Sequence, residues 1–351
     1  MVPAGFLILS SFDILVPAST ANLGGCFDTL GVALQLYLRV RIVDVRQGGS
    51  ARLQVVSSRP QVTGQNAVER AFAAAARQAT VPVPTVQVEI DSDIPLAAGL
   101  GSSAAATVAG LRIFERVTGP LGETTLLALA TALEGHADNA APALLGGMTS
   151  VLDGAPSPDG SREASGPVRA LRWEWPADLR FVVATPHAGL LTAKARAALA
   201  PTISRTDAVF NLQRVLALVH ALQHGEYDRL REALQDRWHQ PARAALVPHL
   251  GAVLAIDDPD VLGAYLSGAG PSVAVLARRN FDRVERLLAS TCEAAGSPVD
   301  VRTLAVHTDM GQDGQDGRQR RDGQEGATPS RLSSPSSPSR HSSPPTPWRS
   351  A

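Results

Sequence analysis

Residues Ile94–Leu111 read IPLAAGLGSSAAATVAGL and carry the strongest local signal in the chain. A predicted strand leads into a glycine-rich turn, and the turn opens directly into an alanine-rich helix. Free amides at such a helix N-terminus, with the helix dipole behind them, form an anion site. Gly99 and Gly101 would let the backbone approach phosphate oxygens closely, and Ser102 or Ser103 would place a hydroxyl on a magnesium ion. The alternative interpretation is an ordinary turn with a serine N-cap.

The number of lysines limits how this turn could bind phosphate. Lys194 is the only lysine in the chain. The glycine-rich turn therefore contains no G-K-[ST] sequence, and a Walker-type P-loop is excluded. Backbone amides, arginines and a metal ion would have to bind phosphate instead.

Composition sets the class of protein. The chain has 351 residues, 44% of them hydrophobic, and a formal net charge of −1. Its length predicts two domains, and its charge argues against nucleic acid or an anionic membrane as a partner. Cys26 and Cys292 are too few for a disulfide framework and favour a reducing, cytoplasmic location. The apolar start lacks a positive n-region, so a signal peptide is not predicted, and no apolar run reaches the length of a membrane span.

Hydrophobic periodicity predicts an α+β organisation in both halves of the chain. The segment from Thr29 to Val45 alternates and predicts a long, half-buried strand whose inward face carries Val32, Leu34, Leu36, Leu38, Val40 and Ile42. We expect further strands near 51–58, 85–91, 170–175, 179–186, 261–268, 272–277 and 300–307. Helices are expected near 66–80, 104–118, 123–135, 193–256 and 282–295.

Composition shifts mark the domain boundaries. A run rich in Pro, Gly and Ser over 153–168 reads as a loop or linker. We therefore expect a ragged N-terminus at 1–10, a first domain at 11–155 and a second domain at 156–307. The mixed-charge, Ser- and Pro-rich tail at 308–351 is predicted to be disordered.

A second polar stretch lies near the start of the chain. PASTANLGGCFDTLG, from Pro17 to Gly31, is far longer than a tight hairpin turn requires. Asn22 and Asp28 in it could merely satisfy backbone amides. Its length and composition instead predict a loop that lines a binding site.

Six segments in a fixed order carry a resemblance to a known family. PLAAGLGSSAA, within the opening stretch, resembles the phosphate-binding motif of the GHMP kinases, which bind ATP without a Walker lysine. The Pro17–Gly31 loop resembles the signature of the homoserine kinases within that family, except that Cys26 stands where glycine is usual. The remaining matches are LEGHADNAAPALLGG (133–147), TAKAR (192–196), PAR (241–243) and LSGAGPSVAVL (266–276). Together the matches extend from about residue 12 to residue 307.

The resemblance implies direct, in-line transfer of the γ-phosphoryl group of ATP to the hydroxyl of L-homoserine, a step of threonine biosynthesis. It implies that Asp28 holds the substrate ammonium and that Arg196 and Arg243 clamp the carboxylate. Asn22 would lie near the reacting hydroxyl, with His136 and Thr192 lining the same pocket. A lone helical arginine such as Arg196 is, in the alternative, usually solvated.

The resemblance also implies residues for ATP and magnesium. ATP would contact Pro95, Leu96, Ala97, Ala98, Gly99, Leu100, Gly101, Ser102, Ser103, Ala104 and Ala105, with Asn66 at the adenine. Glu134 and Ser102 or Ser103 would bind Mg²⁺. Asn22, Arg196 and Glu134 would carry the catalytic effect. A zinc site at Glu134, His136 and Asp138 is disfavoured, because no second His or Cys cluster lies nearby in the sequence.

The implied fold is α+β, the GHMP kinase fold. Its N-terminal domain contains a left-handed βαβ unit, like domain 2 of ribosomal protein S5, and its C-terminal domain is ferredoxin-like. A homodimer is implied by the same resemblance. Two other functions stay open from sequence: a GHMP kinase acting on a different small alcohol, and a catalytically silent sensor with this fold.

Overall fold

The long alternating segment predicted from Thr29 forms β2 (Leu30–Arg46), the strand around which the first sheet is organised. Its burial alternates as expected, with Leu36, Leu38 and Val40 inside and Gln35 and Arg39 exposed. The structure is a computed structural model that describes residues 13–47, 52–62, 66–152 and 168–308. The expectations for 1–10, for 309–351 and for nearly all of the 153–168 linker lie outside the described residues.

The first sheet has the strand order β3-β4-β2-β5-β6, and β1 pairs with β2. Its other strands are β1 (Asp13–Ala21), β3 (Leu53–Arg59), β4 (Thr85–Ser92), β5 (Met148–Leu152) and β6 (Arg169–Trp173). β3 and β4 are parallel and are connected through α1 (Ala67–Gln78), which makes a βαβ unit. The other pairs are antiparallel. The sequence analysis did not predict β5.

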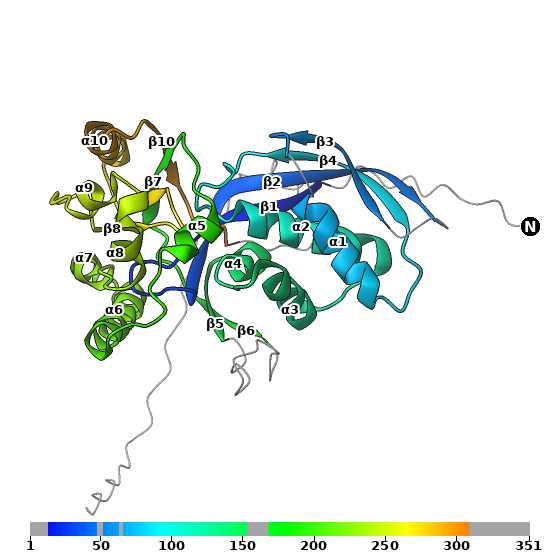
Figure 1. Cartoon of the computed structure of the whole chain (residues 1–351), viewed down its shortest axis with the longest axis horizontal. Helices are drawn as coiled ribbons and strands as arrows, with labels where there is room; N and C mark the ends of the chain where they lie inside the picture. Colours follow the sequence, from blue (N-terminus) through cyan, green and yellow to red (C-terminus); the bar gives the residue numbers. More distant parts are fainter. Residues whose placement is uncertain (1–12, 48–51, 63–65, 153–167, 309–351) are drawn as a thin grey trace, which may run out of the picture. The chain divides into compact units, whose positions relative to one another are not determined.

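Four helices gather on one side of β1–β4 (Figure 1). They are α1, α2 (Ser102–Thr118), α3 (Glu123–Glu134) and α4 (Ala140–Leu145), of which α4 was not predicted. α1 and α2 pack closely, since a Cβ on Gly110 would lie 2.3 Å from the carbonyl oxygen of Val68. The Phe72 and Phe114 rings meet one turn further along both helices, at 5.7 Å. The two helices therefore run in the same direction, and their N-termini lie at the same end.

The polar stretch from Pro17 to Gly31 is shorter as a loop than predicted. β1 continues through Ala21, which pairs with Gly31, and β2 begins at Leu30. The hydroxyls of Ser19 and Thr20 do not face solvent: they hydrogen-bond to other buried polar side chains. Because these partners are distant in sequence, local composition predicted a loop where a strand forms. The loop is Asn22–Thr29.

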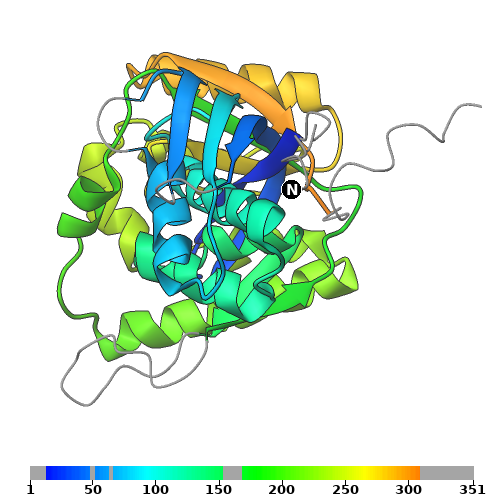
Figure 2. The ribbon, with the colours of Figure 1, turned by 90° about the vertical axis from the view of Figure 1, so that its right-hand side faces the viewer.

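The second sheet has the order β10-β7-β9-β8, with every pair antiparallel. Its strands are β7 (Arg180–Pro186), β8 (Gly263–Leu266), β9 (Val273–Ala277) and β10 (Val299–Leu304). Between β7 and β8 come α5 (Thr192–Ala197), α6 (Arg205–His224), η1 (Tyr227–Arg229), α7 (Leu230–Ala233), α8 (His239–Arg243), η2 (Ala244–Leu246) and α9 (Leu250–Leu254). α10 (Phe281–Ala294) joins β9 to β10 and lies beside β10 (Figure 2). This β-α-β-β-α-β succession is the ferredoxin-like arrangement.

Two sheets with helices segregated along the chain confirm the predicted α+β class. The larger core lies between the first sheet and α1–α4 and continues over one face of the second sheet to α6 and α7. A smaller core lies between the other face of the second sheet, α9 and α10. Among the described residues, no helix is long and apolar enough to cross a bilayer.

Candidate active site

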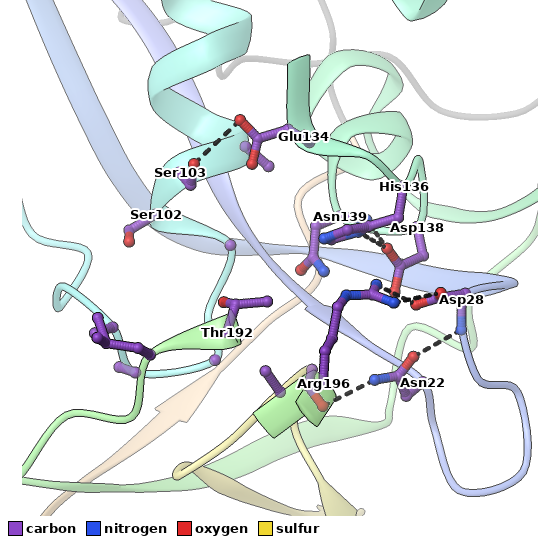
Figure 3. Close-up of a pocket in the computed structure, with 18 of the residues that line it drawn as sticks. Asn22, Asp28, Ser102, Ser103, Glu134, His136, Asp138, Asn139, Thr192 and Arg196 are labelled. Carbon is purple, nitrogen blue, oxygen red and sulfur yellow. Dashed lines mark hydrogen bonds and ion pairs between the residues drawn. The ribbon is translucent and has the colours of Figure 1, made fainter. Parts of the chain in front are cut away.

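A cavity of about 260 Å³ opens where the glycine-rich turn, the Asn22–Thr29 loop and α5 meet (Figure 3). Its walls include residues from both halves of the chain, such as Asn22 and Ser103 from the first and Arg196 and Arg243 from the second. The cavity therefore brings together segments that the sequence analysis could only associate by resemblance.

The glycine-rich turn ends in a helix whose first amides have no side-chain cap. Gly101 is the N-cap of α2, with φ +69°. A Cβ there would lie 2.1 Å from the Ser19 hydroxyl, so only glycine fits. The alternative of a serine N-cap is therefore wrong, since Ser102 and Ser103 already belong to the helix. Amides left uncapped at a helix N-terminus can bind an anion.

The turn is tied to the glycine-rich segment of the second half by hydrogen bonds to its carbonyls and by a close approach of the two backbones. The Ser267 hydroxyl donates to the Gly99 carbonyl at 2.7 Å, and the Ser272 amide donates to the Ala98 carbonyl at 3.2 Å. A Cβ on Gly99 would lie 2.3 Å from the Ser267 carbonyl oxygen. Gly268 in turn donates its amide to the Ala21 carbonyl at 3.0 Å. We call this set of contacts the glycine seam.

Glu134, at the end of α3, faces the first turn of α2. Its Oε1 accepts from the Ser103 hydroxyl at 3.1 Å and from the Thr107 hydroxyl at 2.5 Å, and Arg70 lies 3.9 Å away. Hydroxyl and carboxylate oxygens beside a phosphate-type anion site are the hard donors that Mg²⁺ prefers. The donor set at Ser103 and Glu134 therefore fits a magnesium ion. Ser102 lines the same cavity.

Asp28 and Arg196 hold each other across the cavity (Figure 3). The Arg196 guanidinium donates to both Asp28 oxygens, at 2.7 and 2.9 Å, although the residues are 168 positions apart. The Asp28 side chain is 24% exposed and that of Arg196 35%. Burial opposes the charge on Arg196, but the hydrogen bond and charge of Asp28 outweigh it and raise the Arg196 pKa. The alternative interpretation, that Arg196 is a solvated arginine on a helix surface, is therefore wrong.

Asn22 organises the loop that carries Asp28. Its Nδ2 donates to the Gly268 carbonyl at 2.8 Å, and its Oδ1 accepts from the Asp28 amide at 2.9 Å. Asn22 and Asp28 both have positive φ, 75° and 53°, values that Asn and Asp tolerate better than most residues. The loop is thus fixed to the glycine seam through one side chain.

His136 and Asp138 form a close pair beside Asp28. The His136 Nδ1 and an Asp138 oxygen are 2.5 Å apart, and Asp138 is buried. Burial alone would lower the His136 pKa, but the hydrogen bond and charge of Asp138 outweigh it and raise the pKa. Ligand atoms of Asp28, His136 and Asp138 lie within 4.8 Å of one another. The zinc site disfavoured from sequence would have required Glu134 together with His136 and Asp138. Glu134 instead faces α2.

Arg243 is a deeply buried charge in the cavity wall. The residue is 1% exposed. Its guanidinium donates to the carbonyls of Ala195 and Gly268, at 3.3 and 3.1 Å, and contacts the His239 Nδ1 at 3.2 Å. Burial, and next the charge of Arg196, lower its pKa to about 10, which keeps it protonated at neutral pH. Within the described part of the chain, no carboxylate lies at ion-pair distance from it.

The cavity includes most of the predicted site residues. It is lined by Asn22, Asp28, Ala97, Ala98, Gly99, Gly101, Ser102, Ser103, Ala104, Glu134, His136, Thr192, Arg196 and Arg243. Pro95, Leu96 and Leu100, together with Ala105, do not line it. Asn66 also lies outside the lining: it is the N-cap of α1, and its Oδ1 accepts from the Val68 amide at 2.9 Å.

Several lining residues were missed as ligand contacts. Asp138, Asn139, Leu191, Gly268 and Ala269 also face the cavity. Four of them lie inside segments already singled out, EGHADN and LSGAGPS, so a signal was present. The sequence analysis names Asp138 only as a metal ligand.

Comparison with known proteins relates both halves of the chain to one family. Residues 66–147 match the model of the GHMP kinase N-terminal domain, and residues 218–294 match that of the GHMP kinase C-terminal domain. The homoserine kinase of Solibacter usitatus is 39% identical over 287 residues, which are 80% of this chain and 89% of that protein. That of Deinococcus radiodurans is 40% identical over 265 residues, 75% of this chain and 83% of that protein.

A solved structure agrees with these sequence matches. The crystal structure of homoserine kinase from Cytophaga hutchinsonii superposes with a TM-score of 0.71 at 26% identity. The match covers 87% of this chain and 98% of that one. The similarity therefore extends through both sheets and the cavity between their glycine-rich segments.

Proposed function

Because the chain belongs to the homoserine kinases of the GHMP kinase family, we propose that it phosphorylates L-homoserine with ATP. The product is O-phospho-L-homoserine, a precursor in threonine biosynthesis. One observation carries the substrate assignment: Arg243 is a buried cation without a carboxylate partner in the described structure, in a cavity that also holds Asp28. A buried charge is costly unless a counter-ion reaches it. The carboxylate of an amino acid would supply one.

Binding would exchange partners in the cavity. Asp28 and Arg196 have opposite charges suited to the two ends of a zwitterion, and in the absence of one they neutralise each other. The substrate ammonium would take Asp28, and the substrate carboxylate would take Arg196 and Arg243. Because the Asp28–Arg196 pair is partly exposed, opening it costs little. Thr192 and His136 would complete the walls of this pocket.

The triphosphate would bind the uncapped amides at Gly99–Ser103. Glu134 and Ser103, or Ser102, would hold Mg²⁺, which supplies charge neutralisation for the phosphoryl group when it is bound. Asn66 would contact the adenine. It lies at the same end of the α1–α2 pair as the glycine-rich turn, and its cap bond uses Oδ1, so Nδ2 is the atom suited to a ring nitrogen.

Transfer would proceed in line, with positioning and charge contributing most of the rate. The Asn22 side chain is fixed by the Gly268 carbonyl and by the Asp28 amide, and its second N–H would orient the substrate hydroxyl. Asp28 is not proposed as a general base, because a cation occupies it with or without substrate. The hydroxyl proton would pass to the transferred phosphate. Arg196 would add charge near the reacting centre.

Three further expectations stay predictions. They are the division into domains at 11–155 and 156–307, assembly as a homodimer, and a cytoplasmic location. Burial of both cysteines, Cys26 and Cys292, is compatible with a reducing compartment.

The test is release of ADP from ATP and Mg²⁺ with L-homoserine, mevalonate, galactose or no acceptor. We expect turnover that depends on L-homoserine. Activity with another acceptor alone would keep the family and reject the substrate. ATP binding without turnover on any acceptor would favour the sensor function.

A further inference from the structure

His239 lies one helical turn before Arg243 in α8, so the two side chains share a face of the helix. The residue is completely buried. It belongs to none of the segments from which the site was predicted, and it does not line the cavity. From outside the cavity, it contacts Arg243 and the Asn22–Thr29 loop, both of which contribute to the cavity lining.

One contact is to the buried guanidinium. Arg243 Nη1 lies 3.2 Å from His239 Nδ1. A guanidinium can only donate, so Nδ1 must be the acceptor, and the proton of the neutral imidazole must be on Nε2. Burial is the main influence on the ring and lowers its pKa, which agrees with a neutral imidazole. Beyond Nε2, Asp236 lies 3.6 Å away and accepts hydrogen bonds from other groups.

The other contact is to the loop that carries Asn22 and Asp28. His239 Nε2 lies 2.8 Å from the Gly24 carbonyl oxygen, so the tautomer fixed by Arg243 is the one that can donate to this loop. Gly24 itself packs closely against Leu234, the residue that follows α7, since a Cβ on Gly24 would lie 2.3 Å from the Leu234 carbonyl oxygen. The loop therefore rests directly on the segment that leads into α8.

Phe27 joins the same arrangement. Its ring stacks on the His239 imidazole at 5.4 Å between centroids. The guanidinium groups of Arg196 and Arg243 lie over the Phe27 ring, at 5.6 and 5.3 Å from its centroid. The imidazole thus touches the aromatic ring against which both arginines pack.

We propose that His239 is a positioning residue for substrate binding: its imidazole fixes the Arg243 guanidinium and the Asn22–Thr29 loop relative to each other. This inference rests on the proposed function, in which that loop and Arg243 grip opposite ends of the substrate. It acts on the amino-acid side of the cavity only, because no contact of His239 reaches the glycine-rich turn or Glu134.

Three substitutions separate the two contacts. His239→Phe removes both hydrogen bonds. His239→Asn leaves an acceptor near the position of Nδ1 for Arg243, whereas His239→Gln leaves a donor near the position of Nε2 for Gly24. The matched control is His249→Phe. His249 is also buried and also makes two hydrogen bonds, to Ser297 and to the Pro271 carbonyl, but it contacts neither Arg243 nor the loop.

The measurements are kcat and KM for L-homoserine and for ATP, with melting temperatures. We expect His239→Phe to raise the homoserine KM by about 10- to 100-fold, the range for a hydrogen bond to a charged group, with the ATP KM nearly unchanged. His239→Asn should stay closer to wild type in homoserine KM than His239→Gln. His249→Phe should lower the melting temperature and leave the homoserine KM unchanged.

Equal changes in both KM values, or a stable His239→Phe enzyme with the wild-type homoserine KM, would overturn the proposal. If His239→Phe does not fold, equal homoserine KM values for the Asn and Gln variants would overturn it. A wild-type chain without homoserine-dependent turnover would instead overturn the proposed function, and this inference with it.

Discussion

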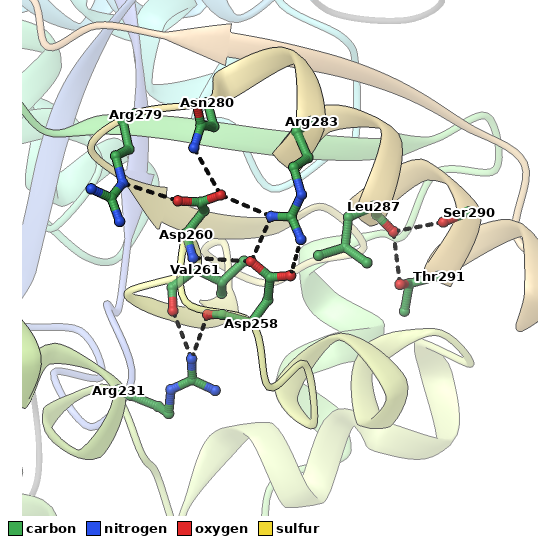
Figure 4. Close-up of polar contacts among 10 residues, drawn as sticks. All are labelled: Arg231, Asp258, Asp260, Val261, Arg279, Asn280, Arg283, Leu287, Ser290 and Thr291. Carbon is green, nitrogen blue, oxygen red and sulfur yellow. Dashed lines mark hydrogen bonds and ion pairs between the residues drawn. The ribbon is translucent and has the colours of Figure 1, made fainter.

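The arginines around the start of α10 and those around the cavity are in opposite electrostatic situations. Beside α10, Arg283 donates to both oxygens of Asp258, at 2.8 and 2.6 Å, and to Asp260 at 2.8 Å (Figure 4). Arg279 adds a bond to Asp260 at 3.1 Å. Every charge in this cluster, which we call the α10 cluster, is neutralised by the chain itself.

In the cavity, three carboxylates and two arginines line the walls, but none of the carboxylates pairs with Arg243 in the described structure. Asp28 serves Arg196, while Arg243 is more deeply buried than any arginine of the α10 cluster and contacts carbonyls and a histidine. The two regions thus differ in whether the chain itself neutralises its charges. A balanced surface cluster stabilises the fold modestly, whereas an unbalanced buried cation marks the place of an anionic ligand group.

The sharpest test exchanges one arginine in each region for methionine. Arg243→Met should reduce kcat/KM for L-homoserine by about 10³-fold, mainly through KM, because truncating one partner of a buried charge pair typically costs 2–5 kcal/mol. Arg283→Met should leave that value unchanged and lower the melting temperature. The measurements are steady-state kinetics and thermal melts of both variants. A loss of homoserine affinity in Arg283→Met would contradict the division into a functional arginine in the cavity and a structural one beside α10.

Asp28→Asn tests the exchange of partners. The amide cannot neutralise the substrate ammonium or Arg196, and we expect kcat/KM for homoserine to fall by about 10²-fold, as for loss of a charged hydrogen bond. The ATP KM should change little. Glu89→Asn, on an exposed strand face, is the control for removing a carboxylate. A Glu89→Asn loss of similar size would argue against a special role for Asp28.

Two glycines that are helix N-caps, one beside the cavity and one remote from it, differ in the same way in their backbone surroundings. Gly101 and Gly122 both have positive φ, 69° and 83°, but a Cβ would strike Ser19 only at Gly101, and nothing lies within 4 Å at Gly122. Gly101→Ala should raise the ATP KM about 10-fold by displacing the turn. Gly122→Ala should cost about 1–3 kcal/mol of stability, because φ 83° with ψ 151° is a conformation that side chains disfavour, and its kinetics should be normal. Similar ATP KM values in the two variants would contradict the anion site at α2.

The smallest effect concerns Asp258 in the α10 cluster. The hydrogen bond from Arg283 is the largest cause that lowers its pKa, to about 2. Since the folded pKa lies below the unfolded one, the carboxylate stabilises the protein at pH above about 4, and this contribution disappears as pH falls towards 2. Asp258→Asn should lower the melting temperature by a few degrees at pH 7 and by progressively less on acidification. A difference from wild type that persists at low pH would argue against the charge as its cause.

Local pattern was sufficient for the parts of the fold that depend on neighbours in sequence. Alternation predicted β2, and glycine with serine before an alanine-rich run predicted a helix that begins directly after the turn, which is α2. β5 is only five residues long and its pairing with β2 and β6 is long-range, so no local period announced it. Likewise, Ser19 and Thr20 read as loop because their partners, Asn139, Ser267 and Tyr265, are remote.

The sequence predicted which residues line the cavity better than it predicted their burial and their hydrogen-bond partners. Resemblance selected Asp28, Arg196 and Arg243, but the pairing of Asp28 with Arg196 spans 168 residues of chain. The burial of Arg243 likewise arises from tertiary packing. His239 escaped notice for the same reason. Its role depends on Gly24, which lies 215 positions away.

The glycine seam has a thermodynamic consequence. Because carbonyls of the glycine-rich turn are bonded to the second half of the chain, the turn acquires its shape when the protein folds and not when nucleotide arrives. Its conformational entropy is therefore lost during folding, and nucleotide binding carries a smaller ordering cost. The two sheets should also melt together in one calorimetric peak, which ATP would move to higher temperature without splitting.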